Sequence, residues 1–214
     1  MFAGPELKKI HPLGKSPVIS IQPEGLAEPI VIAESGLITE YLCEHYGKGS
    51  GLVPQHWRAG KEHQIGGETE EWMRFKYFMH YSESSLMGFM MMALVAGKIK
   101  SSPVPFFIRP ITNRISGEIS NGFVNPNLTT HFQFLEDQLK TSPGGGKFLC
   151  GPKLTAADIL TSFALIASRS RSPSLTAEAY PTLWEYIISL ENNEDYVRVC
   201  KKIEDLEGKF VVVF

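Results

Sequence analysis

The strongest constraint on the fold of this chain is that its β-type segments are confined to the first part of the sequence. Residues 18–21 and 30–32 are short β-branched runs, and the turn-forming residues 23–25 lie between them. Such runs separated by turn residues are typical of an antiparallel hairpin. From about residue 58 onward, apolar residues recur at helical spacing instead. The sequence therefore predicts an α+β chain in which a small sheet precedes an all-helical part.

Turn and capping signals divide the chain further. A helix is expected to begin at Ser35, as its N-cap, and to end at Gly47. Residues 47–57 are rich in glycine and are the best linker candidate, so the expected domains are 1–47 and 58–214. The helical segments expected in the second domain are 58–98 with glycine interruptions, 105–117, 127–139, a fully buried 159–168, one starting at Pro181, and 194–205.

Composition narrows the functional classes. The net charge is −2, which gives no overall basic field for nucleic acid or an anionic membrane. Three widely spaced cysteines and scattered histidines predict neither a disulfide framework nor a metal site, and they favour a reducing compartment. The most apolar stretch is shorter than a membrane span, and no signal peptide is recognisable at the N-terminus. We therefore expect a cytoplasmic protein.

The first chemically informative motif is the step from Ser16 to Pro17 that leads into the first β-type run. Proline cannot donate a hydrogen bond to a strand ladder. A cis bond at this step would turn the backbone N–H and C=O of Ser16 outward, where they can pair with an extended peptide. The alternative is an ordinary turn that enters an edge strand, because cis bonds are a small minority of X–Pro bonds.

The second motif joins the second β-type run to the following helix. Ser35 at a helix N-cap would offer a hydroxyl and free backbone N–H groups, which together with the helix dipole form a carboxylate site. Glu34 beside it could pair with an ammonium group. An anion site next to an acidic group suits the amino-acid end of a γ-glutamyl group, whereas the alternative is a capping serine beside an exposed glutamate.

The third motif is structural. Thr155 and Asp158 precede a strongly apolar run and match a capping box in which aspartate replaces the usual Glu or Gln. Loss of such a cap typically costs about 1 kcal/mol. Asp158 is therefore expected to stabilise a helix start rather than to act as a catalytic base.

A methionine-rich segment is a candidate wall of an apolar pocket. Met87 and Met91 belong to a cluster of four methionines, and such flexible, polarizable side chains suit a pocket for varied apolar molecules. Tyr77 and Tyr81, one helical turn apart, could reach the same pocket. The alternative is ordinary packing between helices.

Taken together and in this order, the three motifs resemble the cytosolic glutathione transferase superfamily. The segments PELKKIHPLGKSPVISI, AESGLITEYL and TAADIL are most similar to its fungal Gtt-type branch, and the similarity covers nearly the whole chain. It implies an N-terminal thioredoxin-like domain, truncated here, followed by an all-α glutathione transferase C-terminal helical domain. By this resemblance the Thr155–Asp158 segment matches the buried N-capping box of the family.

The resemblance also implies the glutathione-binding residues. Pro17 corresponds to the cis-proline of the family, and the backbone of Ser16 would pair with the cysteinyl part of glutathione. Glu34 and Ser35 would hold its γ-glutamyl end, and Lys15 would reach the glycine carboxylate. We expect a first strand, a helix and a second strand of the family to be absent from this chain. The catalytic Tyr, Ser or Cys of most classes lies in that region, so the catalytic residue stays unknown.

The function implied by the resemblance is conjugation of glutathione to electrophilic small molecules, in detoxification or fungal specialised metabolism. Glutathione would be a co-substrate, with no further cofactor and no metal. A homodimer is implied, and neither nucleic acid nor a membrane span is expected. Two alternatives remain open at this point: a non-catalytic binding or regulatory member of the superfamily, and a glutathione-dependent reductase with a cysteine nucleophile.

Overall fold

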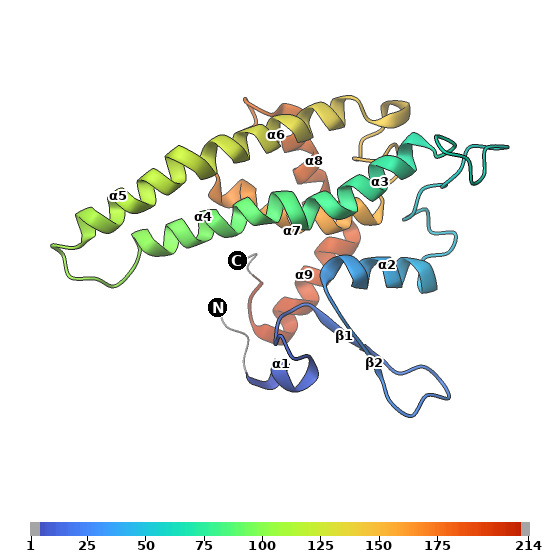
Figure 1. Ribbon diagram of the computed structural model, residues 1–214, viewed down its shortest axis with the longest axis horizontal. Helices are drawn as coiled ribbons and strands as arrows, with labels where there is room; N and C mark the ends of the chain where they lie inside the picture. The colour runs from blue at the N-terminus through green and yellow to red at the C-terminus, as the bar shows by residue number, and fades with distance from the viewer. Residues whose placement is uncertain (1–4, 211–214) are drawn as a thin grey trace.

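The N-terminal part of the chain folds as a short helix, a hairpin and a longer helix (Figure 1). The computed structural model describes residues 5–210, without the side chain of Ser170, so the outermost residues of both expected domains lie outside it. The elements are α1 (Pro5–Ile10), β1 (Val18–Ile21), β2 (Ile30–Ala33) and α2 (Ser35–Tyr46). The sequence analysis did not predict α1, a single exposed stretch without buried residues.

The predicted hairpin is confirmed. Strand β1 pairs antiparallel with β2, with Val18 opposite Ala33 and Ile21 opposite Ile30. The side chain of Ile32 is buried, whereas its neighbour Val31 on the other face is 40% exposed. The described residues form this one two-stranded sheet, and alternation along β2 turns one of its faces toward the protein.

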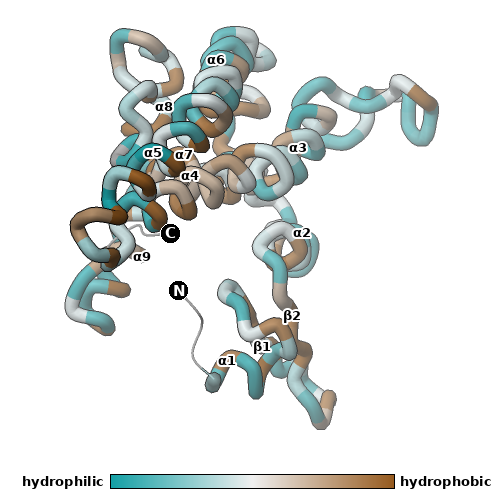
Figure 2. Tube along the Cα trace, turned by 60° about the vertical axis from the view of Figure 1, so that its left-hand side comes forward, coloured by the Kyte–Doolittle hydropathy of each residue, from teal (hydrophilic) through white to brown (hydrophobic). Residues whose placement is uncertain are grey.

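The rest of the chain is helical. The elements are α3 (Glu70–Tyr81), the π-helical turn η1 (Ser82–Leu86), α4 (Met87–Lys100), α5 (Arg109–Ile119), the π-helical turn η2 (Ser120–Val124), α6 (Asn125–Lys140), the 3₁₀ turn η3 (Pro143–Gly145), α7 (Ala156–Arg171), α8 (Pro181–Glu191) and α9 (Glu194–Glu207). Figure 2 shows α1, β1 and β2 gathered on one side of these helices, with α2 between the hairpin and α3.

The expected helix over residues 58–98 begins later than the sequence indicated. Residues 47–69 are irregular, and Gly66 has a positive φ of 75°, a conformation that favours glycine and ends helical continuation. Thr69 then caps α3, since its hydroxyl accepts a hydrogen bond of 3.2 Å from the backbone N–H of Trp72. The linker between the two parts is therefore longer than the expected 47–57.

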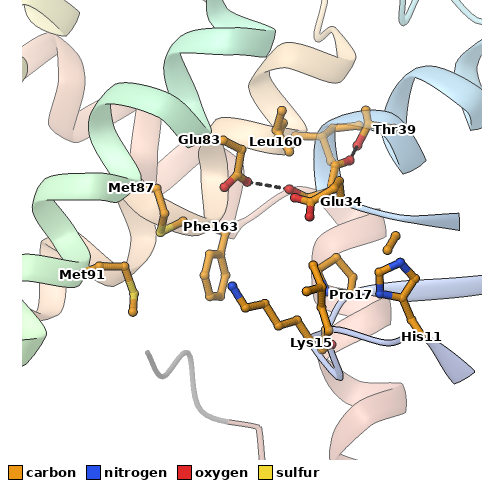
Figure 3. A pocket seen from close by; sticks show the side chains of 15 residues that line it. His11, Lys15, Pro17, Glu34, Thr39, Glu83, Met87, Met91, Leu160 and Phe163 are labelled. Carbon is orange, nitrogen blue, oxygen red and sulfur yellow. Dashed lines mark hydrogen bonds between the residues drawn. The ribbon is translucent and has the colours of Figure 1, made fainter. Parts of the chain in front are cut away.

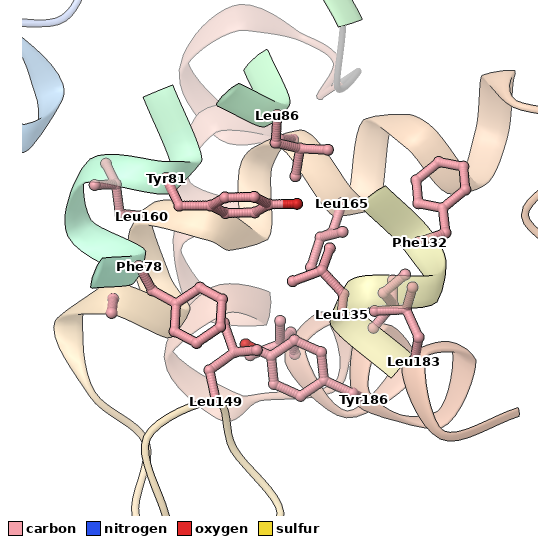
Figure 4. Packing of buried hydrophobic residues seen from close by; sticks show 14 of the residues in the cluster. Phe78, Tyr81, Leu86, Phe132, Leu135, Leu149, Leu160, Leu165, Leu183 and Tyr186 are labelled. Carbon is pink, nitrogen blue, oxygen red and sulfur yellow. The ribbon is translucent and has the colours of Figure 1, made fainter. Parts of the chain in front are cut away.

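Among the described residues, the main cluster of buried side chains lies in the part of the chain that follows this linker. Phe78 of α3, Phe132 and Leu135 of α6, Leu165 of α7 and Leu183 of α8 are fully buried and pack in one cluster (Figure 4). These side chains recur at helical spacing on their elements, which is why the helices associate through single apolar faces.

Helix α7 is less buried than the sequence indicated. The expectation of a fully buried segment at 159–168 is wrong for one stripe, because Ile159 and Phe163 are 49% and 45% exposed. They are four positions apart and lie on one face, while Leu165 and Ala167 face the core. The exposed stripe faces the N-terminal part of the chain, which sets up the cleft described below.

A capping box is present at the start of α7. The carboxylate of Asp158 accepts hydrogen bonds from the backbone N–H of Thr155 at 2.8 Å and from its hydroxyl at 2.7 Å. It also accepts bonds from the N–H of Leu149 at 3.0 Å and the hydroxyl of Tyr186 at 2.7 Å. Asp158 is fully buried, so one carboxylate joins the preceding loop, α7 and α8.

Helices α4 and α5 extend away from the other helices as a long antiparallel pair (Figure 1). The loop that joins them, residues 101–108, lies at the far end of the molecule in this view. Within residues 5–210, no helix combines the length and the apolar character that a bilayer span requires.

Candidate functional site

A cleft of about 680 Å³ lies between the N-terminal part and the helical body. It contains all five residues that the sequence analysis assigned to glutathione and both candidate methionines. The first side is formed by His11, Leu13, Lys15, Ser16, Pro17, Ala33, Glu34, Ser35 and Thr39; the second is formed by Glu83, Met87, Met91, Ile159, Leu160 and Phe163 (Figure 3). Segments separated by more than a hundred residues in the sequence thus meet at one site.

Ser16 and Pro17 lie immediately before the start of β1, on the edge of this cleft. The peptide bond between them is cis, the conformation that the sequence analysis considered for peptide pairing. Ser16 is exposed, and Val18 directly after Pro17 begins the strand. The backbone of Ser16 therefore borders both the sheet and the cleft.

The junction between β2 and α2 differs in one respect from the expectation. Glu34, not Ser35, is the N-cap residue of α2, and Ser35 is the first helical residue. The hydroxyl of Ser35 does not cap the helix because it donates a hydrogen bond of 2.7 Å to the carboxylate of Glu83. Glu34 has φ 73° and ψ 119°, an uncommon backbone conformation for a residue with a side chain.

Glu83 is a site residue that the sequence analysis missed. It lies in the π-helical turn η1, and it reaches across to Ser35 on α2 (Figure 3). No sequence pattern around Glu83 marks it as a site residue, because it meets the cleft only when α2 packs against the helical body. Glu34 and Glu83 thus provide two carboxylates beside the start of α2, where an ammonium group could bind.

The helical side of the cleft is mostly apolar. Met87 and Met91 are one turn apart on α4, and Phe163 extends from the exposed stripe of α7. Figure 3 shows the side chain of Lys15 directed toward the ring of Phe163 from the opposite side. The cleft therefore has Lys15 and Glu34 on its N-terminal wall, and its helical wall is apolar apart from Glu83, a combination typical of small-molecule sites.

Comparison with known proteins relates this architecture to one family. The family described as "Glutathione S-transferase, C-terminal domain" matches residues 112–195. Glutathione S-transferase 1 of Saccharomyces cerevisiae is 28% identical over 208 residues, which cover 97% of this chain and 82% of the yeast protein. Glutathione S-transferase 3 of Schizosaccharomyces pombe is 22% identical over 203 residues, or 95% of this chain and 74% of that protein.

Over nearly its whole length, the chain is similar to glutathione transferases. Both curated relatives are fungal, in agreement with the resemblance to the fungal Gtt-type branch.

Solved structures show that the fold is also that of glutathione transferases. A glutathione transferase homologue from Lodderomyces elongisporus, solved with two glutathione molecules per subunit, has a TM-score of 0.65 at 18% identity, covering 91% of this chain and 78% of that one. URE2P8 of Phanerochaete chrysosporium, solved with oxidised glutathione, has a TM-score of 0.67 at 14% identity, covering 97% and 80%. The fold class is thus a thioredoxin-like N-terminal part followed by an all-α domain.

The two candidate tyrosines lie outside the cleft. Tyr77 and Tyr81 border a separate depression near Met73 and His80. Tyr81 is buried, burial raises the pKa of its hydroxyl far above the usual range, and this hydroxyl lies 2.7 Å from Nδ1 of His131. Their assignment to the apolar pocket is therefore wrong. Residues two positions apart on a helix face different sides, so Glu83 faces the cleft while Tyr81 cannot.

Neither Cys43 nor Cys150 shows a sign of activation. Burial, followed by the charge of Asp158, raises the pKa of the Cys150 thiol to about 12. Burial and then the charge of Glu40 raise the pKa of the Cys43 thiol. Low-pKa thiolates are the reactive form of cysteine, and within residues 5–210 no cysteine lines the cleft. Nothing in this part of the chain favours the cysteine-based reductase alternative.

No group of three or more His, Cys, Asp or Glu side chains suited to a metal ion occurs in the part of the chain that the structure describes. The charged groups of the cleft itself are Glu34, Glu83 and Lys15, and the imidazole of His11 also lines it. This set can bind a zwitterionic ligand through its ammonium and carboxylate groups.

Proposed function

We propose that the chain binds glutathione in the cleft and conjugates its sulfur to electrophilic small molecules. The observation that supports this proposal is the convergence of Lys15, Ser16, Pro17, Glu34 and Ser35 on one cleft, although they come from two separate sequence motifs. Similarity to glutathione transferases is consistent with a transferase, and glutathione is the co-substrate that this similarity implies.

The N-terminal wall can recognise each part of the tripeptide. The backbone N–H and C=O of Ser16 pair with the cysteinyl unit in the manner of an added strand. The first N–H groups of α2, a helix of 12 residues, bind the γ-glutamyl carboxylate, and Glu34 pairs with its ammonium group. Glu83 adds a second carboxylate next to Ser35, and Lys15 binds the glycine carboxylate.

The helical wall holds the second substrate. Met87, Met91 and Phe163 form an apolar surface that faces the bound tripeptide. In the reaction, the glutathione thiolate forms a bond to an electrophilic carbon, and a leaving group departs from that carbon with the electron pair. A hydrogen-bond donor at the sulfur would lower the pKa of the thiol and so favour the thiolate; its identity stays open.

The proposal includes the setting in which this chemistry operates. We infer a cytoplasmic homodimer in which residues 1–47 form the glutathione-binding part and residues 58–214 form the helical domain. The electrophile is a xenobiotic or an intermediate of fungal specialised metabolism.

A non-catalytic binding or regulatory role is the second candidate. The observation that favours it is that, within residues 5–210, neither a tyrosine nor a cysteine lines the cleft. Such a protein would bind glutathione through the same N-terminal wall without activating its sulfur.

The test combines binding and turnover measurements on the full chain. Calorimetric titration with glutathione should show binding. Glu34→Ala and Ser35→Ala should each weaken it about tenfold, since the first removes the partner of the ammonium group and the second removes the hydroxyl that holds Glu83 at the cleft. Glu28→Ala, an exposed carboxylate in the hairpin loop, is the matched control and should leave affinity unchanged. Conjugation is then followed with an aryl halide.

The outcomes separate the two candidates. Binding together with conjugation supports the transferase, whereas binding without conjugation of a panel of electrophiles supports the non-catalytic role. If Glu34→Ala and Ser35→Ala bind glutathione as tightly as the unmodified chain, the cleft assignment is wrong.

A further inference from the structure

The helices α4 and α5 form a pair that protrudes from the rest of the molecule. Met87 and Met91, at the start of α4, line the cleft, and the rest of the pair extends away from it. We call residues 87–119 the arm and its loop, residues 101–108, the tip. A buried hydrogen bond joins the two helices away from the tip: the hydroxyl of Ser116 on α5 donates to the backbone carbonyl of Ala96 on α4 at 2.8 Å. Ala96 and Ser116 are both buried. The tip is therefore held by two helices that are hydrogen-bonded to each other.

The tip exposes two large aromatic side chains. Phe106 and Phe107 are 81% and 65% exposed, and their ring centroids are 5.6 Å apart in an edge-to-face arrangement. Ile111 and Ile115, one turn apart on α5, continue the apolar surface and are also exposed. Adjacent phenylalanines at the outermost point of a protein have no partner inside the fold, and contiguous exposed apolar surface marks an interaction site.

The charge of the arm differs from that of the whole chain. Between Glu83 and Glu118 the sequence contains no Asp or Glu, but it contains Lys98, Lys100, Arg109 and Arg114. The arm therefore holds four basic residues against one acidic residue, Glu118, and the rest of the chain holds seventeen basic residues against twenty-two acidic ones. The net charge of −2 therefore conceals a basic arm on an acidic body, so the exclusion of anionic surfaces from overall charge does not hold for this segment.

We propose that the tip of the arm docks on an anionic lipid membrane. The rings of Phe106 and Phe107 enter the boundary between headgroups and acyl chains, while the exposed Lys100, Arg109 and Arg114 contact lipid phosphates. Basic residues around an exposed apolar tip match the two attractions that hold peripheral proteins at membranes. The arm lies on the surface without crossing the bilayer.

The same charges argue against a second copy of the chain as the occupant. A two-fold contact between tips brings the same surface patch of both copies together. It would oppose the basic residues around one tip with those around the other, and residues 84–117 contain no Asp or Glu to compensate. An anionic surface satisfies both the charge and the apolar character of the tip.

The experiment is flotation of the full chain with vesicles of phosphatidylcholine, with and without phosphatidylserine. The chain should bind the vesicles that contain phosphatidylserine, and added salt should weaken binding because it screens the basic residues. Phe106→Ser with Phe107→Ser should reduce the partition coefficient at least about tenfold. Lys100→Gln, Arg109→Gln and Arg114→Gln should reduce it about fivefold each.

Matched controls lie outside the arm. Ile65→Ser with Leu206→Ser removes two exposed apolar side chains elsewhere, and Lys201→Gln with Lys202→Gln removes two exposed basic ones. Both double variants should bind vesicles like the unmodified chain. Phe106→Trp provides a second readout, since its emission should shift to shorter wavelength on addition of vesicles that contain phosphatidylserine.

Three results would overturn the proposal. The first is absence of binding to either vesicle, and the second is equal binding of the phenylalanine double variant. The third is a change of oligomeric state in that variant, measured by light scattering, which would make the tip a contact between protein chains.

Discussion

The N-terminal part and the helical body contrast in how they are held together. In residues 5–46 the buried hydrophobic side chains are Ile32 and Ile38, both 7% exposed. The body instead has a continuous core in which Phe78, Phe132 and Leu165 are fully buried. A two-stranded hairpin is marginal by itself, so the N-terminal part depends on the packing of α2 against α7 for its order.

The contrast also separates two kinds of chemistry. The polar groups of the cleft belong mainly to the weakly packed part, while its apolar wall belongs to the body. Residues with few buried contacts open locally at low cost. The helical body therefore acts as a support against which the ligand-binding segment is ordered.

The largest effect is expected at the buried carboxylate of the body. Asp158→Ala leaves four donors, from Thr155, Leu149 and Tyr186, without their acceptor. Loss of the cap and of these bonds should cost at least about 3 kcal/mol of the free energy of unfolding. Thermal denaturation should show a midpoint roughly 10 °C lower, whereas Asp137→Ala, an exposed aspartate of α6, should change it little. An unchanged midpoint would contradict the proposed contribution of Asp158 to the stability of the helical body.

A pair of core truncations compares the two parts directly. Leu165→Ala should cost about 3 kcal/mol in a urea unfolding curve, because it leaves a cavity in the shared core. Ile32→Ala should cost about 1 kcal/mol or less in the same curve, while it accelerates hydrogen exchange of the amides in β1 and β2. If both substitutions shift the unfolding curve equally, the two parts form one cooperative unit and the contrast fails.

The smallest effect concerns a buried carboxylate that ties α6 to α8. Burial alone would raise the pKa of Glu136, but hydrogen bonds from Leu183 and Thr182 and the ion pair with Lys140 outweigh it and hold this pKa below its usual value. Its contribution is therefore present above the unfolded-state pKa and is lost as pH falls through the lower folded-state pKa.

Glu136→Gln should accordingly flatten the fall in the free energy of unfolding between neutral and acidic pH by about 1 kcal/mol. Denaturant curves at several pH values measure this slope. Glu118→Gln, an exposed glutamate of α5, is the control and should leave the slope as it is. An identical slope in the Glu136 variant would contradict the assigned hydrogen bonds.

Much of the fold follows from signals that act over a few residues. The hairpin from 18 to 33 is encoded by β-branched runs and a turn, and the start of α7 by Thr155 with Asp158. The positions of α6, α8 and α9 agree with the expected periodic segments to within a few residues. For the site, the local motifs at 15–17 and 34–35 identified residues that the structure places at one cleft.

Other features arise only from tertiary contacts. Ser35 was expected to cap α2, but the proximity of Glu83 across the cleft gives its hydroxyl a different partner. The π-helical turn at 82–86 directs Glu83 toward the cleft, while Tyr77 and Tyr81 face elsewhere. Helix α7 keeps Ile159 and Phe163 partly exposed, because this face borders the cleft and not the core.

Local residue order therefore specifies where the strands, caps and most helices lie and which polar motifs could recognise a tripeptide. Turn formation, capping and helical periodicity depend on neighbours within one or two turns, so they can be derived from residue order alone. Packing between the elements selects the helix faces that line the cleft. It places Glu83 there and places Tyr77 and Tyr81 elsewhere. Those choices depend on the packing of α2 against α7 and on the phase of α3 and α4, and no local pattern specifies either.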